Sequence, residues 1–150
     1  MPCLTVSSHL RPEHGYFEQI EVDFTPRSDD ASLPQDGHMV RWANEVLDAM
    51  DRLGRPLRLN SELTKQRLAD AGFVDVKEEI IRLPVNGWPR DAHGREVGRW
   101  FNIAIRLSLE SLMLAPLNLT CGRTPEEVHE LAEAVQKEIF SNSVHAYCTL

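Results

Sequence analysis

The sequence contains no uninterrupted apolar run as long as a membrane span, which needs roughly 18 to 20 residues. Its Lys and Arg residues are scattered and the net charge is −7, whereas a nucleic-acid surface needs clustered cations. The first residues also lack the basic start and long apolar core of a secretory signal. We therefore expect an intracellular protein, cytoplasmic or nuclear, that binds neither a membrane nor nucleic acid.

Cysteine is scarce, and the three residues present, Cys3, Cys121 and Cys148, are far apart with no C-x-x-C pair. That spacing argues against a disulfide framework and against a zinc knuckle, so we expect three reduced thiols. The histidines are dispersed and form no H-E-x-x-H pattern. No metal site is therefore predicted.

Loops that bind nucleotides are missing from the sequence as well. It contains no G-x-G-x-x-G, no G-x-x-x-x-G-K-[ST] and no G-x-S-x-G. The chain therefore carries no recognisable phosphate-binding loop of its own and no nucleophile elbow. No catalytic residue can be assigned from the sequence.

What is present is typical of one globular domain: 150 residues, 42 % of them hydrophobic and 26 % charged. We predict a loose N-terminus over residues 1–8 and a domain over 9–150. Strand-like and helix-like patterns then alternate, which favours an α/β layer fold. The expected strands cover residues 15–24, 73–83 and 144–150, and the expected helices cover about 39–53, 61–71, 95–115 and 125–139.

Several of these boundaries have a local cause. Gly54 is expected to end the first helix in a left-handed cap, and Asn60 to begin the second. Thr124, Pro125 and Glu127 form a capping-box pattern at the start of the fourth helix. The loop of residues 25–37 is rich in Pro, Asp, Ser and Gly, and its length suggests a functional cover or a mobile connection.

Three carboxylates lie along or just beyond the first predicted strand, at Glu18, Glu21 and Asp23. They are placed as general bases or ligand-binding groups would be at the carboxyl end of a strand in an open α/β sheet. Solvation at the edge of a strand explains the same residues.

The remaining candidates are aromatic or cationic. Trp42, Trp88 and Trp100 are suited to line an apolar substrate pocket, or else to pack between helices. Arg99, beside Trp100 and Asn102, is suited to bind an acidic group of a substrate, or else to lie on an exposed helix face.

Certain motifs resemble class I S-adenosylmethionine-dependent methyltransferases. The run Leu10–Gly15 followed by Tyr16-Phe17-Glu18 resembles the "L-x-P-G-G" turn and fifth strand of that family, although Glu13 replaces the first Gly and His14 is one residue extra. The run Ala71–Val76 resembles the "A-G-F-x-x-V" entry to the sixth strand. Gly98–Asn102 and His145-Ala146-Tyr147 resemble the LaeA-like group of fungal secondary-metabolism methyltransferases. The likeness covers residues 9–150.

The resemblance implies a partial Rossmann-like methyltransferase fold with four helices and a mixed sheet of about three strands, equivalent to strands five, six and seven. In the family, S-adenosylmethionine binds in the N-terminal half, on a Gly-rich loop and a later acidic residue. Neither motif is present here, so no cofactor is expected to bind this chain alone. Of the family's functional regions, only the substrate-binding side can be assigned to this chain. It corresponds to the insertion over residues 24–53 and the helix over residues 95–115.

On this basis we predict six substrate-binding residues and no catalytic, cofactor-binding or metal-binding ones. The six are Glu18, Trp42, Trp88, Arg99, Trp100 and Asn102.

The same resemblance implies an unpartnered sheet edge. In the complete fold the fifth strand lies between the fourth and the seventh, and the fourth is not expected here. One edge of Tyr16–Asp23 would then be open, and open edges invite pairing with another chain. We expect a protein partner or a homo-oligomer through this edge.

The function implied is methyl transfer to a small molecule in fungal secondary metabolism, with a partner chain supplying the cofactor half. The chain is expected to be inactive alone. A second hypothesis is a truncated pseudoenzyme that acts as a regulatory subunit. A third is a cyclase or isomerase that uses the apolar cap, which ranks last because no acid–base pair is evident. A fourth is an incomplete gene model or a decayed gene.

Overall fold

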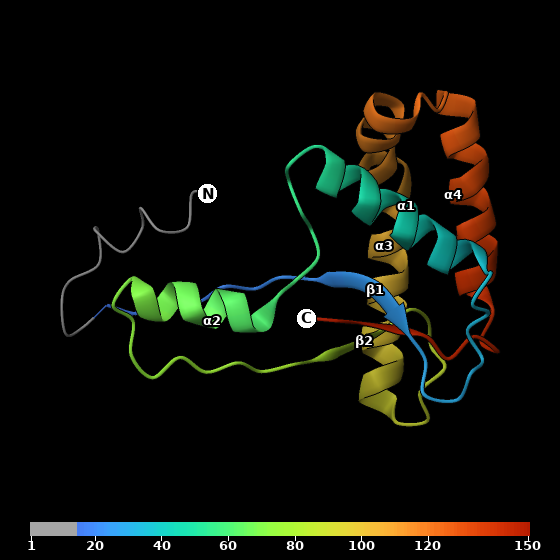
Figure 1. The fold of residues 1–150 in the computed structure, drawn as a ribbon. Helices are drawn as coiled ribbons and strands as arrows, with labels where there is room; N and C mark the ends of the chain where they lie inside the picture. Colours follow the sequence, from blue (N-terminus) through green and yellow to red (C-terminus); the bar gives the residue numbers. More distant parts are fainter. Residues whose placement is uncertain (1–14) are drawn as a thin grey trace. The chain divides into compact units, whose positions relative to one another are not determined.

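The computed structural model describes residues 15–150 (Figure 1). The predicted loose N-terminus and the predicted turn over residues 9–14 lie outside the described residues. The elements are β1 (Asp23–Arg27), α1 (His38–Arg52), α2 (Ser61–Asp70), β2 (Arg82–Pro84), α3 (Ala92–Cys121), α4 (Pro125–Phe140) and β3 (Tyr147–Thr149). They fall into two compact units. The α2 unit comprises the described residues up to Glu21 with Leu59–Ile80, and the sheet unit comprises Val22–Arg58 with Ile81–Leu150.

The sheet has the strand order β1-β3-β2 and is antiparallel throughout. We expected a mixed sheet, and that expectation is wrong because the central strand β3 runs opposite to both of its neighbours. β1 and β2 consequently run in the same direction. The register pairs Tyr147 with Arg27 on one side and with Pro84 on the other, so β1 and β2 end at the same edge.

Three helices pack on one another beside this sheet. α1, α3 and α4 contact each other pairwise, while α1 also contacts β1 and α3 also contacts β2. Their apolar faces form a single core with the strands. The largest fully buried side chains include Trp42, Met39, Leu47, Ile105, Leu109, Met113, Leu117 and Ile139. The predicted α/β class with four helices is therefore present.

The helix ends follow the local signals in the sequence. Gly54 lies just beyond α1 with φ of +69°, where a side chain would be strained. Thr124 accepts a hydrogen bond from the Glu127 amide, and the Glu127 carboxylate accepts one from the Thr124 amide. The predicted capping box of α4 is confirmed. The apolar residues that recur at three- and four-residue spacing in this helix are buried: Val128, Leu131, Ala132, Val135 and Ile139.

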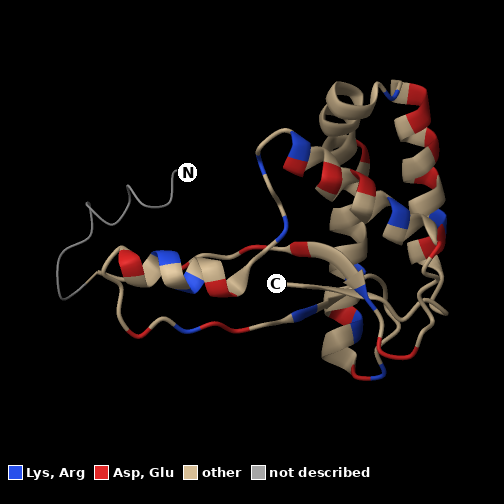
Figure 2. Ribbon diagram, viewed as in Figure 1, with Lys and Arg blue, Asp and Glu red and all other residues tan. Residues whose placement is uncertain are grey.

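α3 is longer than predicted, running from Ala92 to Cys121. Asp91 accepts a hydrogen bond from the Gly94 amide at its start, and Gly122 ends it in the left-handed region. We expected an end at about Ala115, whereas the helix continues through the buried Pro116, although proline normally breaks a helix. Beyond Glu110 the helix carries no charged residue, which Figure 2 shows as a continuous tan stretch.

By length and composition alone, α3 is also apolar enough to cross a membrane. Core helices of folded domains meet the same criterion. Asn102, Ile105, Leu109 and Met113 lie buried on the face of α3 that packs in the core. The composition of this helix is therefore weak evidence for a membrane span.

Two of the predicted strands are much shorter than expected. β1 begins only at Asp23, and Tyr16 and Ile20 are exposed in non-strand backbone, so the predicted strand over residues 15–24 is wrong for most of its length. Val74 and Ile80 are likewise exposed, and β2 is confined to Arg82–Pro84. The cause is the central strand: β3 has three residues, so it offers ladder partners to only a few residues on either side.

The α2 unit has little buried surface of its own. Asn60 caps α2 as predicted, with its side chain accepting a hydrogen bond from the Leu63 amide at 2.9 Å. No residue of α2 is buried, however, and Leu63 is 44 % exposed. The spacing of Leu63, Leu68 and Ala71 predicts that they face inward, which is wrong for Leu63, while Leu68 and Ala71 are half-buried.

Within the sheet unit, α3 makes a close backbone contact at Gly98. A Cβ atom added there would lie 2.0 Å from the carbonyl oxygen of Asn86. Only glycine allows the helix to approach the loop after β2 this closely.

Candidate functional site

The ends of β1 and β2 and the start of β3 form what we call the carboxyl edge of the sheet. Arg27 ends β1, Pro84 ends β2, and both pair with Tyr147 at the start of β3. Open α/β sheets bind ligands outside the carboxyl ends of their parallel strands. The loop after β1 brings Asp29 and Asp30 to this edge, where they contact β2 and the segment at the start of β3.

Asp29 joins both neighbouring strands. Its carboxylate accepts a hydrogen bond from the Tyr147 hydroxyl at 2.8 Å and pairs with the Arg82 guanidinium at 2.6 Å. The Arg82 guanidinium also lies 4.5 Å from the centre of the Tyr147 ring. The Tyr147 hydroxyl, followed by Arg82, holds the pKa of Asp29 below its usual value, and the bond to Asp29 raises the pKa of Tyr147.

Asp30 is surrounded by hydrogen-bond donors. Its carboxylate accepts from the Ser32 amide at 3.0 Å and from the Ser28 hydroxyl at 2.9 Å, and it contacts Nδ1 of His145. Hydrogen bonding with Ser32 and then with His145 holds the pKa of Asp30 well below its usual value. Between these residues Ala31 has φ of +59°, an uncommon conformation for a residue other than glycine.

His145 lies on the other side of this contact. Its backbone amide donates to the Ser32 hydroxyl at 2.8 Å, and its ring lies 5.1 Å from that of Trp88 at an angle of 31°. Trp88 is itself fixed, because its indole N–H donates to the Ala146 carbonyl and its amide donates to Oδ1 of buried Asn86.

We call Asp29, Asp30, Arg82, Trp88, His145 and Tyr147 the carboxyl-edge cluster. Of these, only Trp88 was predicted as a site residue. The signals that could have indicated the others are the Asp29-Asp30 pair in the predicted functional loop and the His145-Ala146-Tyr147 motif. Both were visible in the sequence, but nothing in it showed that they meet.

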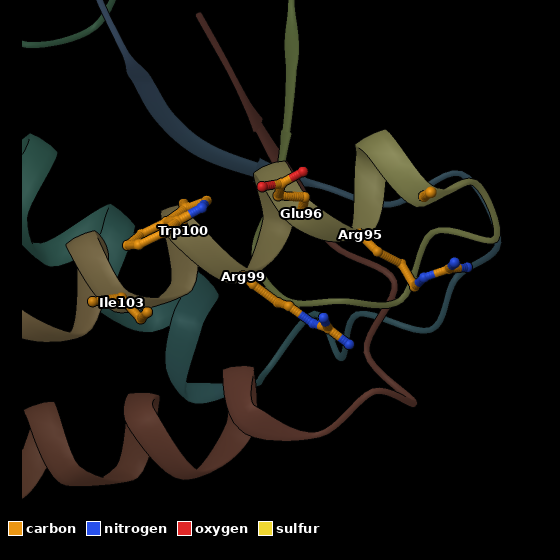
Figure 3. A pocket seen from close by; sticks show the side chains of 6 residues that line it. Arg95, Glu96, Arg99, Trp100 and Ile103 are labelled. Carbon is orange, nitrogen blue, oxygen red and sulfur yellow. The ribbon is translucent and has the colours of Figure 1, made fainter.

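A second feature is an open depression along the first turns of α3, with a volume of about 480 Å³ (Figure 3). It is lined by Ala92, Arg95, Glu96, Arg99, Trp100 and Ile103. Arg99 and Trp100, both predicted as site residues, line this depression, but Figure 3 shows their side chains pointing away from each other.

The other predicted residues lie elsewhere. Trp42 is 1 % exposed and packs edge-on against Phe24 in the core, 6.0 Å between ring centres. Asn102 is buried, and its amide donates to the carbonyls of Val85 and Ile139 at 2.7 and 3.2 Å. Both side chains therefore have contacts within the core, and their assignment to the substrate stays a prediction. Glu18 is exposed and belongs to the α2 unit.

Over residues 15–150, no three His, Cys, Asp or Glu side chains gather where they could hold a metal. At the carboxyl edge, Asp29 and Asp30 are already paired with the cluster's own donors.

Comparison with known proteins gives close relatives over most of the chain. It is 61 % identical to the protein-methionine methyltransferase laeA of Chaetomium globosum over 94 % of this chain and 44 % of that protein. It is 42 % identical to the secondary metabolism regulator laeA of Fusarium oxysporum f. sp. lycopersici, over 97 % of this chain and 46 % of that protein. The corresponding regulator of Aspergillus fumigatus is 39 % identical, over 95 % and 38 %.

The chain therefore spans less than half the length of these curated relatives. No protein-family model matches the chain. No solved structure matches it either.

Proposed function

We propose that the chain belongs to the LaeA group of fungal proteins and is the substrate-side part of a methyltransferase that acts in the control of secondary metabolism. The observation that carries this proposal is the identity of 61 % to a named methyltransferase over 94 % of the chain. Names of other relatives, such as secondary metabolism regulator, support the biological setting.

The sheet supports an equivalence of β1, β2 and β3 with strands five, six and seven of a Rossmann-like methyltransferase. In that fold the fifth strand lies between the fourth and the seventh. Among the described residues β1 pairs with β3 only, so its other edge has no ladder partner. We propose that this edge, Asp23–Arg27 rather than Tyr16–Asp23, pairs with a strand of the cofactor-binding part.

Residues outside these 150 are proposed to bind S-adenosylmethionine, either in the same polypeptide or in a partner chain. The sequence has no Gly-rich loop, and the carboxylates of the carboxyl-edge cluster are already paired. The name of the Chaetomium relative gives a protein methionine as the methyl acceptor. The small-molecule acceptor predicted above is the alternative to be distinguished, and its expected contact is the depression on α3.

The test is reconstitution. The 150-residue chain, the N-terminal part of the Chaetomium relative, and the two together are titrated with S-adenosylmethionine by isothermal calorimetry. We expect no binding by the chain alone, and methyl transfer from labelled cofactor only when both are present. Micromolar binding by the chain alone, or a mixture without transfer to either peptide methionine or small-molecule acceptors, would contradict the proposal.

A second candidate function is a regulatory subunit without catalysis, which the printed name of several relatives favours. The regulatory and the catalytic function are distinguished in a fungal host that lacks the endogenous relative. The chain is expressed there together with a cofactor-binding part that has been altered so that it no longer binds S-adenosylmethionine. If metabolite production is restored, the regulatory function is supported. Loss of that rescue supports the methyltransferase. In either case we propose a cytoplasmic or nuclear location, as for an intracellular regulator.

A further inference from the structure

Among the described residues, the imidazole of His145 has two contacts: Asp30 contacts Nδ1, and the Trp88 ring lies beside it. The backbone amide of His145 donates to the Ser32 hydroxyl, which ties the backbone at this position to the same loop as Asp30. Trp88 is tied to Ala146 by its indole N–H at 3.0 Å. The ring is therefore oriented by residues from two separate segments, the loop after β1 and the loop after β2.

That orientation also fixes which nitrogen carries the proton. A carboxylate only accepts hydrogen bonds, so Nδ1 of His145 must donate to Asp30. In the neutral ring, Nε2 then carries a free lone pair. No described residue makes a hydrogen bond to Nε2, and the side chain is 39 % exposed at the carboxyl edge.

We propose that His145, oriented by Asp30, accepts a proton from a ligand whose reacting group is a hydroxyl or an amine. In this step the Nε2 lone pair forms a new N–H bond, the O–H or N–H bond of the ligand breaks, and its electron pair remains on the ligand atom. The resulting imidazolium is stabilised by the Asp30 carboxylate.

This inference rests on the proposed methyl transfer and specifies the class of methyl acceptor. A methionine thioether has no proton to lose, so a proton acceptor has no task in its methylation. A hydroxyl or amine becomes a better nucleophile when a base takes its proton. The His145–Asp30 pair therefore favours an acceptor with a removable proton, in addition to or in place of methionine.

The backbone beside Asp30 supports a role beyond holding the loop. Ala31 keeps a left-handed conformation, which is unfavourable for a residue other than glycine and persists only where neighbouring contacts impose it. The loop is already tied to the sheet by Asp29, through Tyr147 and Arg82. The half-exposed His145 imidazole is therefore not needed to attach the loop to the sheet, and it supplies an accessible base.

The experiment uses the 150-residue chain alone with 4-nitrophenol, a proton-bearing probe that changes colour on ionisation. We expect a saturable rise in phenolate absorbance with protein concentration, together with ¹⁵N-histidine spectra that place the His145 proton on Nδ1. His145→Gln abolishes the rise and Asp30→Asn weakens it. The matched control is His129→Gln, an exposed histidine paired with Glu110 between α3 and α4, which leaves the rise unchanged.

The proposal is overturned by a proton on Nε2, by no saturable rise with the unaltered chain, or by an equal rise with His145→Gln. The tautomer is read on the unaltered chain, so it remains decisive if a variant does not fold. Because no cofactor is present, failure here leaves the calorimetric test of methyl transfer intact, and failure of reconstitution leaves this result intact.

Discussion

Asn102 shows how one side chain can hold three segments together. Its buried amide on α3 donates to the carbonyl of Val85 after β2 and to that of Ile139 near the end of α4. Asn102→Ala leaves both carbonyls without this donor, and an unsatisfied buried polar group costs about 1–3 kcal/mol. We expect a loss of that size in the free energy of unfolding, measured by urea denaturation. Asn44→Ala, at an exposed position of α1, serves as the control and should be neutral or slightly stabilising.

Asp30 gives a prediction about pH. Its pKa in the folded chain lies below the ordinary value of 3.8, so the ionised carboxylate stabilises the fold above that pH. The contribution is lost as the pH falls through the folded-state pKa. Asp30→Asn should therefore lower the melting temperature at pH 7 by an amount that shrinks below about pH 3.8. Asp36→Asn, at an exposed position of the same loop, is the matched control and should leave the melting temperature at pH 7 close to that of the unaltered chain.

For single residues, the sequence indicated which side chains have suitable chemistry for a ligand, but not whether those side chains are buried or which residues they contact. Arg99 and Trp100 were adjacent in the sequence and line the same depression. Trp42 and Asn102 were suitable for a ligand by chemistry, yet both are buried, and burial depends on which helices meet. The contact of Asp30 with His145 joins residues 115 positions apart, and no local pattern reports such a pairing.

Among the elements, α4 has the best-defined start. Thr124→Ala removes the side-chain acceptor of the capping box, and loss of an N-cap typically costs about 1 kcal/mol. We expect that decrease in unfolding free energy by urea denaturation. Thr124→Ser keeps the hydroxyl and should stay close to the unaltered chain. Equal stability of the Ala variant would show that the cap observed here contributes nothing.

α3 gives a steric prediction. Gly98→Ala places a methyl group against the Asn86 carbonyl, and overpacking of this kind costs about 1–3 kcal/mol or more. Circular dichroism should show a lower melting temperature and a less cooperative transition. Gly87→Ala is the matched control, because the nearest atom would lie 3.6 Å from the added Cβ. A Gly98→Ala variant as stable as the control would contradict the close approach.

Element boundaries were predictable where a local device set them. Helix ends are set by residues within one turn, so the sequence shows them directly. Examples are Gly54 after α1, Asn60 before α2 and the capping box that begins at Thr124. The lengths of the strands were not predictable, because β1 and β2 extend only as far as β3 supplies ladder partners. The β-branched and aromatic residues of 15–22 and 73–81 favour strands. These segments are not strands, because they have no neighbouring strand among the described residues with which to form backbone hydrogen bonds.

For the whole molecule we predict unequal local stability. α2 has no buried residue, whereas α3 places seven residues in the core. Regions with little burial open at low free-energy cost. Amide hydrogen exchange should therefore be fast over residues 61–70 and slow over the middle of α3. Strong protection of α2 would mean that a surface outside the described residues covers it.

The α/β class, the four helices and the relationship to the LaeA group were accessible from the sequence because they depend on periodicity and motifs. The antiparallel sheet was not, because strand direction is set by how long connections return to the sheet. The carboxyl-edge cluster was missed for the same reason.

The close contact at Gly98 has a mechanical consequence. The close contact between Gly98 and the Asn86 carbonyl restricts sliding and rotation of α3 at that point, so a tilt of the helix would pivot there. Cys121 lies 23 residues further along α3, a lever arm of roughly 35 Å at 1.5 Å per residue. A tilt of a few degrees near the carboxyl edge would displace the far end of α3 by ångströms. The orientation of α3 at the Gly98 contact and the position of the α3–α4 turn are thereby geometrically linked.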